Sequence, residues 1–446
     1  MPDSQNLVSA KPSKDFFIDM ITRDLSLTDS VLDLIDNSID QAVERTQADV
    51  MRVLTDGGQI ASLRGNRISL RLSGDQFVIE DTCGGIPIED ARNTVFLFGN
   101  PSERGAPSGL SVYGIGMKRA FFKLGRLITV RSATDDDWFV VEIDVDEWKK
   151  RPDEWRFSFK EFGATRKHPK VTSGTTTIKV ARLRDEVRLR LGESSFQKEL
   201  IDKVAATYSL FIRAGLQIRI NGTKVSSNLP TLGTYRRITP ARKLLHTDGE
   251  QVVILIIAGI TPKDDRLPRG WYVFCNGRMV LEADRSRATG WGETLPQWHS
   301  KFGHFVGYVY FKSRDVRRLP WTTTKQGVVL DAPVYQTALR EMRVQARPVL
   351  NFLSKMYPPD LEEEDVAERE LLLKTKSTPI NHVRKDTSFH ADLDSETRTR
   401  ANAPVNIQYK KPRRDVERIK QHLHKPAMSA SSVGSYTFDY FLKQEF

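Results

Sequence analysis

One stretch near the start of the chain, LSLTDSVLDLIDNSIDQAV at residues 25–43, has the pattern of a helix with one polar and one apolar side. Ser26 or Thr28 can accept hydrogen bonds from the first-turn amides, which is typical of a helix start. The polar residues recur at i, i+3, i+4 and i+7 and therefore share one face. They are Asp33, Asp36, Asn37 and Asp40. An Asn oxygen on such a face can ligate Mg²⁺, and a carboxylate one turn earlier can deprotonate a water. The alternative is a solvated helix face.

Two later segments favour a ligand site over a solvated face. The segment FVIEDTCGGIP at 77–87 ends an apolar run at Asp81 and continues with two glycines, where the backbone turns tightly or approaches a ligand. The segment GLSVYGIGMKRA at 109–120 brings three glycines and a lysine to the start of an apolar helical stretch. Free amides at a glycine-rich helix start attract phosphate, and a lysine adds positive charge. The three segments in this order predict a site for a phosphate-bearing ligand.

This ordered set resembles the GHKL nucleotide-binding fold, which is named for gyrase B, the ninety-kilodalton heat-shock chaperones, histidine kinases and MutL. The first helix is similar to the N-box of that family, and DTCGGI is similar to its adenine box. The segment YGIGMK resembles the phosphate-binding end of the ATP lid and is most similar to the MORC-like and MutL-like branches. Residues Ser173-Gly174-Thr175-Thr176 resemble the G-T element on the strand behind adenine.

The resemblance implies ATP and Mg²⁺ as ligands and gives individual residues a role. Asn37 matches the Mg²⁺ ligand, Asp33 the catalytic base and Asp81 the acceptor for the adenine amino group. The remaining nucleotide-binding positions are Asp40, Gly85, Gly114, Ile115, Gly116, Met117, Lys118 and Thr175. Two departures are present: Asp33 is one methylene shorter than the family's Glu, and Cys83 replaces the first glycine of the adenine box. We therefore expect ATP binding with slow hydrolysis.

Alternating strands and helices around these segments predict an α/β fold with helices on one sheet face. The resemblance implies a GHKL (Bergerat) α/β sandwich at residues 1–182 and an α/β transducer-like domain of the S5 type at 183–358. Two Asn-Gly pairs, in LQIRINGTKV and WYVFCNGRMVL, predict type I′ hairpins in that second region. In the loop LPWTTTKQG, Lys325 resembles the transducer lysine that reaches the γ-phosphate and stabilises charge on the transferred group. The alternative is a solvent-facing lysine.

The two ends of the chain predict contacts with other molecules. Residues 1–24 form either a local element packed on the core or, by resemblance to GHKL dimers, a strap that crosses to a second copy when ATP binds. Residues 359–432 are expected to form a charged, largely flexible tail, since 374–426 contains 13 Lys and Arg against 6 Asp and Glu. The aromatic segment at 433–446 is expected to dock on this chain or on a protein partner.

Composition restricts the remaining possibilities. The formal charge of +11 favours nucleic acid as a partner through phosphate contacts, although a merely basic soluble protein has the same composition. Two cysteines without a C-x-x-C pair exclude a disulfide framework. No apolar run approaches the ~20 residues of a membrane span, and the first residues lack a signal core. We therefore expect a cytoplasmic protein without membrane contact. P-loop and zincin motifs are absent from the sequence.

These observations predict Mg²⁺-dependent ATP binding and slow hydrolysis that drive lid closure and ATP-dependent homodimerisation. The resulting clamp or switch is expected to act on DNA or in a DNA-processing or defence assembly. The alternative is a nucleotide-gated scaffold that binds ATP and a protein partner without significant hydrolysis. A chaperone is disfavoured because no large client-binding domain fits before residue 358. A histidine kinase is disfavoured because no dimerisation helix with a phosphoacceptor His precedes the ATP-binding segments.

Overall fold

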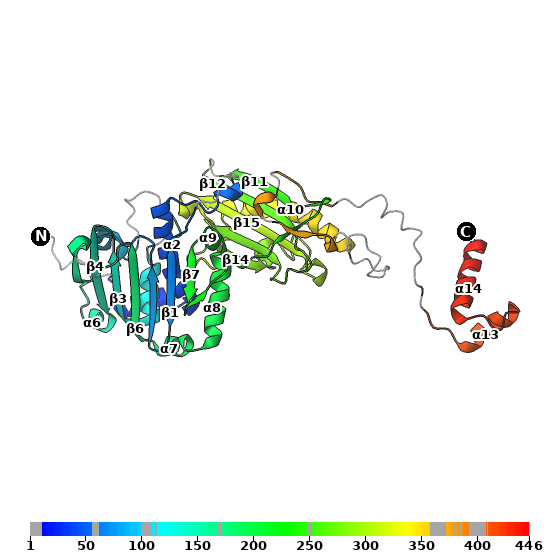
Figure 1. Ribbon diagram of the computed structural model, residues 1–446, viewed down its shortest axis with the longest axis horizontal. Helices are drawn as coiled ribbons and strands as arrows, with labels where there is room; N and C mark the ends of the chain where they lie inside the picture. Colours follow the sequence, from blue (N-terminus) through cyan, green and yellow to red (C-terminus); the bar gives the residue numbers. More distant parts are fainter. Residues whose placement is uncertain are drawn as a thin grey trace, which may run out of the picture. The chain divides into compact units, whose positions relative to one another are not determined.

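The computed structural model describes residues 11–445 with several gaps, and all structural statements below refer to these residues. The gaps are 56–61, 100–108, 112–113, 168–170, 248, 250, 357–371, 379, 384–385, 392–406 and 408. The chain divides into two compact units, Met1–Asp392 and Leu393–Phe446, which we describe separately (Figure 1). No helix in the described part of the chain is both long enough and apolar enough to cross a membrane.

An eight-stranded mixed sheet forms the first layer of the larger unit (Figure 1). Its order is β5-β4-β3-β6-β2-β1-β7-β8, in which only β1 and β7 run parallel as neighbours. The bounds are β1 (Arg67–Leu72), β2 (Gln76–Asp81), β3 (Gly125–Ala133), β4 (Asp137–Asp144), β5 (Phe159–Ala164), β6 (Thr175–Leu183), β7 (Gln217–Ile220) and β8 (Thr223–Lys224). The mixed α/β fold class is confirmed.

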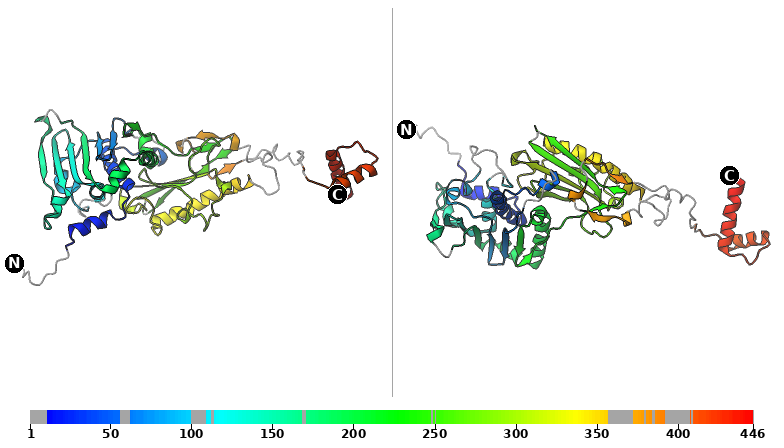
Figure 2. Two further views of the ribbon diagram at one scale, coloured as in Figure 1. Left: turned by 90° about the horizontal axis from the view of Figure 1, so that it is seen from below. Right: turned by 45° about the horizontal axis from the view of Figure 1, so that its top comes forward.

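Helices cover one face of this sheet (Figure 2). The predicted central helix is α2 (Leu27–Thr46), and the cap is Ser26, whose Oγ accepts from the Asp29 amide at 3.0 Å. It packs against α5 (Gly116–Leu124), which in turn contacts α1 (Lys14–Thr22). The other helical elements of this part are α3 (Arg52–Thr55), α4 (Ile88–Asp90), η2 (Ala91–Val95), α6 (Val145–Lys149), η3 (Thr165–Lys167), α7 (Asp185–Leu191), α8 (Ser194–Thr207) and α9 (Ser209–Arg213).

The first sheet extends past the domain boundary that we placed between residues 182 and 183. Strand β7 pairs in parallel with β1, and Ile218 and Ile220 are fully buried there. The turn between β7 and β8 has positive φ at both Asn221 and Gly222, as a type I′ hairpin requires. The boundary is therefore corrected to a point after Lys224, because the apolar side of the hairpin is buried in the first layer.

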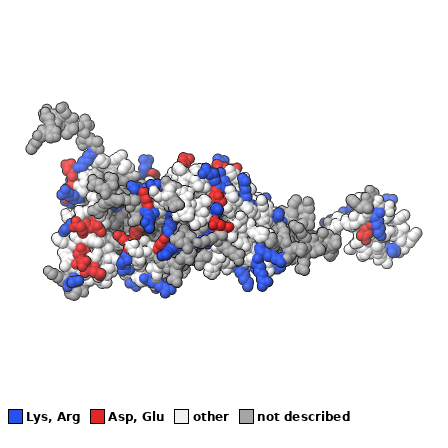
Figure 3. All heavy atoms as spheres, turned by 90° about the horizontal axis from the view of Figure 1, so that it is seen from above, with Lys and Arg blue, Asp and Glu red and all other residues white. Residues whose placement is uncertain are grey.

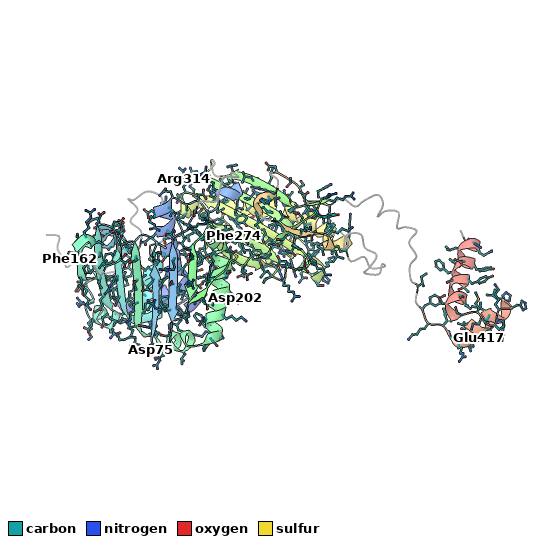
Figure 4. All side chains as sticks on the ribbon, viewed as in Figure 1. Asp75, Phe162, Asp202, Phe274, Arg314 and Glu417 are labelled. Atoms are coloured by element: carbon teal, nitrogen blue, oxygen red, sulfur yellow. The ribbon has the colours of Figure 1, made fainter. Side chains whose placement is uncertain are left out.

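A five-stranded sheet is the second large sheet of this unit, in the order β11-β12-β15-β13-β14. The bounds are β11 (Ala241–Thr247), β12 (Val252–Ile260), β13 (Gly270–Cys275), β14 (Arg278–Asp284) and β15 (Phe305–Ser313). Strand β12 is a near-continuous apolar run, and such strands are covered on both faces. Helix α10 (Pro333–Lys355) packs on this sheet. Phe274, labelled in Figure 4, is fully buried in the sheet.

The turn between β13 and β14 confirms the second predicted hairpin, since φ is positive at Asn276 and Gly277. Short 3-10 turns complete the region. They are η4 (Arg287–Thr289), η5 (Ser300–Phe302), η6 (Val316–Arg318) and η8 (Ile380–His382).

The prediction of a largely flexible segment at 359–432 is wrong in part. Strand β16 (Lys376–Thr378) pairs with β9 (Leu232–Thr234), and β17 (His390–Ala391) pairs with β10 (Ile238–Thr239). Backbone pairing with strands already in place orders these polar residues without a core of their own. In the smaller unit, α13 (Arg413–His422) contacts α14 (Ala430–Glu445), which covers most of the predicted docking segment. Several aromatic side chains of α14 are exposed, namely Tyr436, Phe438, Tyr440 and Phe441.

Candidate functional site

A cavity of about 370 Å³ lies between α2, the start of α5 and the loop that carries Lys325. It brings together most of the residues that the sequence predicted for nucleotide binding. These are Asp33, Asn37, Asp40, Gly114, Ile115, Gly116, Met117, Lys118 and Lys325. Further lining residues that the sequence did not single out are Gln41, Glu44, Ile86, Thr94, Val95, Ser111, Arg119 and Thr323. Asp81, Gly85 and Thr175, at the predicted adenine end, are not among the residues that line this cavity.

The predicted base, Asp33, is engaged by an arginine. Arg119 donates from Nε to Asp33 Oδ2 at 2.5 Å and from Nη2 to Asp33 Oδ1 at 3.0 Å. Both side chains are less than a tenth exposed. The two parallel bonds form a bidentate ion pair, which fixes both groups in orientation as well as in charge. Neither oxygen of Asp33 is unpaired in this state.

Asn37 and Asp40 connect α2 to the end of the lid segment. Asp40 accepts from the amides of Leu110 at 2.6 Å and Ser111 at 2.9 Å, so it anchors the segment by its backbone. Asn37 donates from Nδ2 to the Asp33 carbonyl at 2.8 Å, and its Oδ1 accepts from Ser111 Oγ at 3.2 Å. The amide oxygen of Asn37 therefore faces the lid side of the cavity. The predicted lid residues 100–108 and 112–113 lie outside the described residues.

The residues around the cavity offer few ligands for Mg²⁺. Within the described parts of the chain, no group of three or more His, Cys, Asp or Glu side chains could hold a metal. Asn37 instead offers one amide oxygen. Mg²⁺ commonly keeps several waters and is bound through few protein oxygens plus substrate phosphates. The donor set thus fits an ion that arrives with a phosphate-bearing substrate.

The predicted phosphate turn has the expected backbone. Gly114 has φ +63°, a left-handed conformation that favours glycine, and Gly116 is the first residue of α5. Lys118 is buried on the cavity wall, where its ammonium donates to the Val95 carbonyl at 2.9 Å. Burial lowers the pKa of Lys118 to about 7. A nearby phosphate would favour its charged form, because an opposite charge raises the pKa of an amine.

Asp81 lies at the end of β2 and is 6% exposed. It accepts from Ser38 Oγ at 2.7 Å and from the Cys83 amide at 3.0 Å. Burial raises the pKa of Asp81 to about 6, although these two hydrogen bonds oppose the shift. Positive φ begins at Gly84, so Cys83 occupies its position without a left-handed backbone. Asp81 is thus a buried carboxylate held in one orientation.

The threonine beside Asp81 is Thr176 rather than the predicted Thr175. Thr176 is directly opposite Asp81 in the β2–β6 pairing, is 3% exposed and lies 2.9 Å from Ser132 Oγ. Thr175 instead donates to the Thr172 carbonyl. The physical reason is strand alternation, because Thr176 shares a face with the buried Ile178 and Val180. That alternation could have identified Thr176 from the sequence.

Asp36 does not line the cavity with the other polar residues of α2. It lies in a buried charge cluster that joins α2 to the second sheet, which we call the Asp36 cluster. Asp36 accepts from Lys325 Nζ at 2.7 Å, Arg278 Nε at 2.9 Å and Tyr208 Oη at 2.8 Å. Burial alone would raise the pKa of Asp36, but Arg278 and Lys325 outweigh it and hold the pKa below its ordinary value. Lys325 is thus both a cavity residue and a partner of Asp36.

The loop at Lys325 is held in an unusual conformation. Lys325 has φ +57°, which is uncommon for a residue other than glycine. Arg278 Nη1 donates to the Lys325 carbonyl at 2.8 Å and supports this conformation. The same arginine therefore neutralises Asp36 and fixes the loop.

Residues 25–175 match the family model of the histidine kinase-, DNA gyrase B- and HSP90-like ATPases. This part of the chain is therefore similar to GHKL-type ATPase domains. The match spans α2, the adenine-box segment, the start of α5 and the first residue of β6, and it supports ATP binding. No curated protein matches the chain.

Sequence reasoning singled out neither Arg119 nor Arg278 at this site and its border, and it misplaced Asp36. Arg119 follows Lys118 directly but was not considered separately. Arg278 stands between the apolar runs WYVFC and MVL, and a lone cation in such a hairpin indicates a buried partner. Asp36 was placed with the cavity residues because helical spacing alone does not show which neighbour a side chain faces.

The first prediction concerns Gly85, which has φ +78° and lies so close to β3 that a Cβ would be 2.0 Å from the Ala133 carbonyl oxygen. Gly85→Ala should lower the free energy of unfolding by about 3–4 kcal/mol, since it combines a left-handed conformation with a backbone clash. Gly65 also has positive φ (+89°), but among the described residues no other atom would lie within 4 Å of its Cβ. Gly65→Ala should therefore cost only about 1–2 kcal/mol. If urea unfolding shows the same loss in the free energy of unfolding for both variants, the backbone clash at Gly85 is contradicted.

Proposed function

We propose that this protein is a Mg²⁺-dependent ATPase that turns over slowly and uses ATP to close its lid and dimerise as a molecular clamp or switch. The observation that carries the proposal is the cavity in which α2, the phosphate turn and Lys325 meet. Three segments more than 70 residues apart in the sequence supply its acid, its glycine-rich amides and its second-domain cation. The match of residues 25–175 to a family of ATPases supports the ATP binding in this proposal.

The proposed roles follow from the chemistry of each side chain. Asn37 supplies an oxygen for Mg²⁺, which in turn lowers the negative charge of the phosphates. Asp81 accepts a hydrogen bond from the adenine amino group. The threonine assigned to this end of the site is Thr176, which lies beside Asp81, and no longer Thr175. The amides of Gly114 and Gly116 with Lys118 bind phosphate oxygens, while Asp40 positions the lid through its backbone bonds. Asp33 orients and deprotonates the attacking water, and Lys325 stabilises charge on the transferred group.

The second prediction tests Mg²⁺-ATP binding through Asn37. Asn37→Ala should weaken binding of ATP in the presence of Mg²⁺ by about tenfold or more, which corresponds to about 1.4 kcal/mol. In EDTA the variant and wild type should bind alike, because the lost oxygen serves the ion. Asn228→Ala, at an exposed asparagine, is the matched control. Titration calorimetry with and without Mg²⁺ gives both affinities.

Turnover and assembly are measured on the same proteins. Wild type should release phosphate slowly, and Asp33→Ala should bind ATP without turnover. Sedimentation with a non-hydrolysable ATP analogue should show a dimer, whereas ADP should leave a monomer. Absence of ATP binding by wild type would reject the proposed function, and binding without any dimer would reject the clamp.

A second candidate function is a nucleotide-gated scaffold that binds ATP and a protein partner without significant hydrolysis. The bidentate pair of Asp33 with Arg119 favours it, because a carboxylate with both oxygens paired is not a free base. The exposed aromatic residues of α14 are candidate contacts for the partner. Phosphate release that is indistinguishable from that of Asp33→Ala would favour the scaffold.

We further propose DNA as the partner of the clamp, by analogy with MORC-like and MutL-like proteins and from the charge of +11. On the face of the larger unit seen in Figure 3, basic and acidic side chains are interspersed. In the smaller unit, α13 carries the basic sequence RRDVERIK. Duplex binding that weakens steeply with salt would support DNA binding, and affinity without salt dependence would reject it.

A further inference from the structure

Arg119 is a buried cation at the phosphate end of the cavity. It lies in the first turn of α5, three residues after Gly116, and a Cβ on Gly116 would lie 3.4 Å from Asp33 Cγ. The phosphate turn, Asp33 and Arg119 are therefore packed against one another. An arginine presents a planar set of donors that suits both carboxylates and phosphates.

The ion pair blocks the proposed base while it is closed. Asp33 accepts from Nε and Nη2 of Arg119, so both of its oxygens are occupied. A buried ion pair resists opening, since each partner would lose its counter-charge in a low-dielectric environment. The pair can open readily only if a second anion takes over the guanidinium.

Under the proposed function, the cavity is where such an anion would bind. The other cations that line it are already bonded: Lys118 donates to the Val95 carbonyl, and Lys325 donates to Asp36. Arg119 differs from both because its partner is the residue proposed to deprotonate the water. A phosphate near Gly116 would compete directly with Asp33 for Arg119, and guanidinium binds phosphate oxygens in the same bidentate manner.

We propose that Arg119 senses the γ-phosphate of ATP: it leaves Asp33, binds the γ-phosphate and thereby releases Asp33 to act as the base. This inference rests on the proposed function. In the step that follows, the water oxygen bonds to the γ-phosphorus, and the proton of that water passes to Asp33. The bond between the γ-phosphorus and the bridging oxygen breaks, and its electrons remain on ADP. ADP has no γ-phosphate, so Arg119 returns to Asp33 and the base is blocked again.

The third prediction follows from the competition. Asp33→Asn should raise the affinity for a non-hydrolysable ATP analogue about tenfold, since Arg119 is no longer held by a carboxylate. Arg119→Gln should lower that affinity by about tenfold or more. Because ADP has no γ-phosphate, neither substitution should change the affinity for ADP by more than about twofold. Lys123→Gln, on the same helix but outside the cavity, is the matched control.

The ratio of analogue to ADP affinity decides the outcome. An unchanged ratio in Asp33→Asn would overturn the inference, because the pair would then be structural only. The double variant with Asp33→Asn and Arg119→Gln should lack the increased affinity for the ATP analogue, since that increase depends on Arg119. This result would support the inference. Arg119→Lys keeps the positive charge, and it replaces Arg119→Gln in these measurements if Arg119→Gln does not fold. If wild type binds neither nucleotide, the proposed function fails before this inference is reached.

Discussion

Asp81→Asn should abolish most ATP binding while making the nucleotide-free protein more stable at neutral pH. The loss of affinity should be about 10- to 100-fold, the effect of removing one hydrogen bond to a charged acceptor. The gain in stability arises because ionised Asp81 is buried without a cation bonded to it, and burial raises its pKa to about 6. Asn can keep both hydrogen bonds, accepting from the Cys83 amide and donating to Ser38 Oγ. We expect a gain of about 1–3 kcal/mol at pH 7.5.

The pH dependence of this gain has a definite sign. The folded protein binds a proton at Asp81 more tightly than the unfolded chain, whose ordinary value is 3.8. Between about pH 4 and pH 6 the folded state therefore holds more protons, so the free energy of unfolding falls as the pH rises. The advantage of Asp81→Asn should be smaller at pH 5 than at pH 7.5 in thermal unfolding.

A matched control and a contradicting result are available. Asp75 lies in the exposed turn between β1 and β2 and is labelled in Figure 4. Asp75→Asn should change neither ATP affinity nor stability appreciably. A lower stability of Asp81→Asn at pH 7.5, or a gain that does not depend on pH, would show that burial of the charge is not the main effect.

The second large effect is expected in the Asp36 cluster. Asp36→Asn leaves Arg278 and Lys325 buried together without a carboxylate, at 1% and 6% exposure. Uncompensated buried charge typically costs about 3–5 kcal/mol, and we expect a loss of that size in the free energy of unfolding. Lys325→Met should cost far less, about 1 kcal/mol, because Arg278 still neutralises Asp36. Urea unfolding of both variants without nucleotide measures the difference.

This asymmetry bears on the proposed role of Lys325 at the transferred phosphoryl group. If Lys325→Met destabilises the protein as much as Asp36→Asn, the lysine is a fixed part of the cluster and cannot serve as a mobile contact to the γ-phosphate. If the cost is small, Lys325 can leave Asp36 without exposing an unpaired carboxylate. Tyr208 and Arg278 then remain to hold Asp36.

Local patterns predicted much of the fold. The cap at Ser26, the strands around the adenine-box segment and the two Asn-Gly turns are short-range features, determined by side chains within a few residues of one another. The domain boundary was wrong because β7 joins the first sheet by pairing with β1, about 150 residues earlier in the chain. Likewise, β16 is ordered by β9, a strand that no local pattern connects with it.

The candidate site divides in the same way. The sequence by itself identified most of the predicted cavity residues of α2 and the phosphate turn, since helical spacing and glycine conformation are local properties, but it also placed Asp36 there. Only the tertiary structure decided what these residues contact: Asp33 pairs with Arg119 from another helix, and Asp36 with Arg278 and Lys325 from the second sheet and its loop. Burial makes these pairs strong, and burial depends on how distant segments pack. The spacing of charges along the chain does not contain that information.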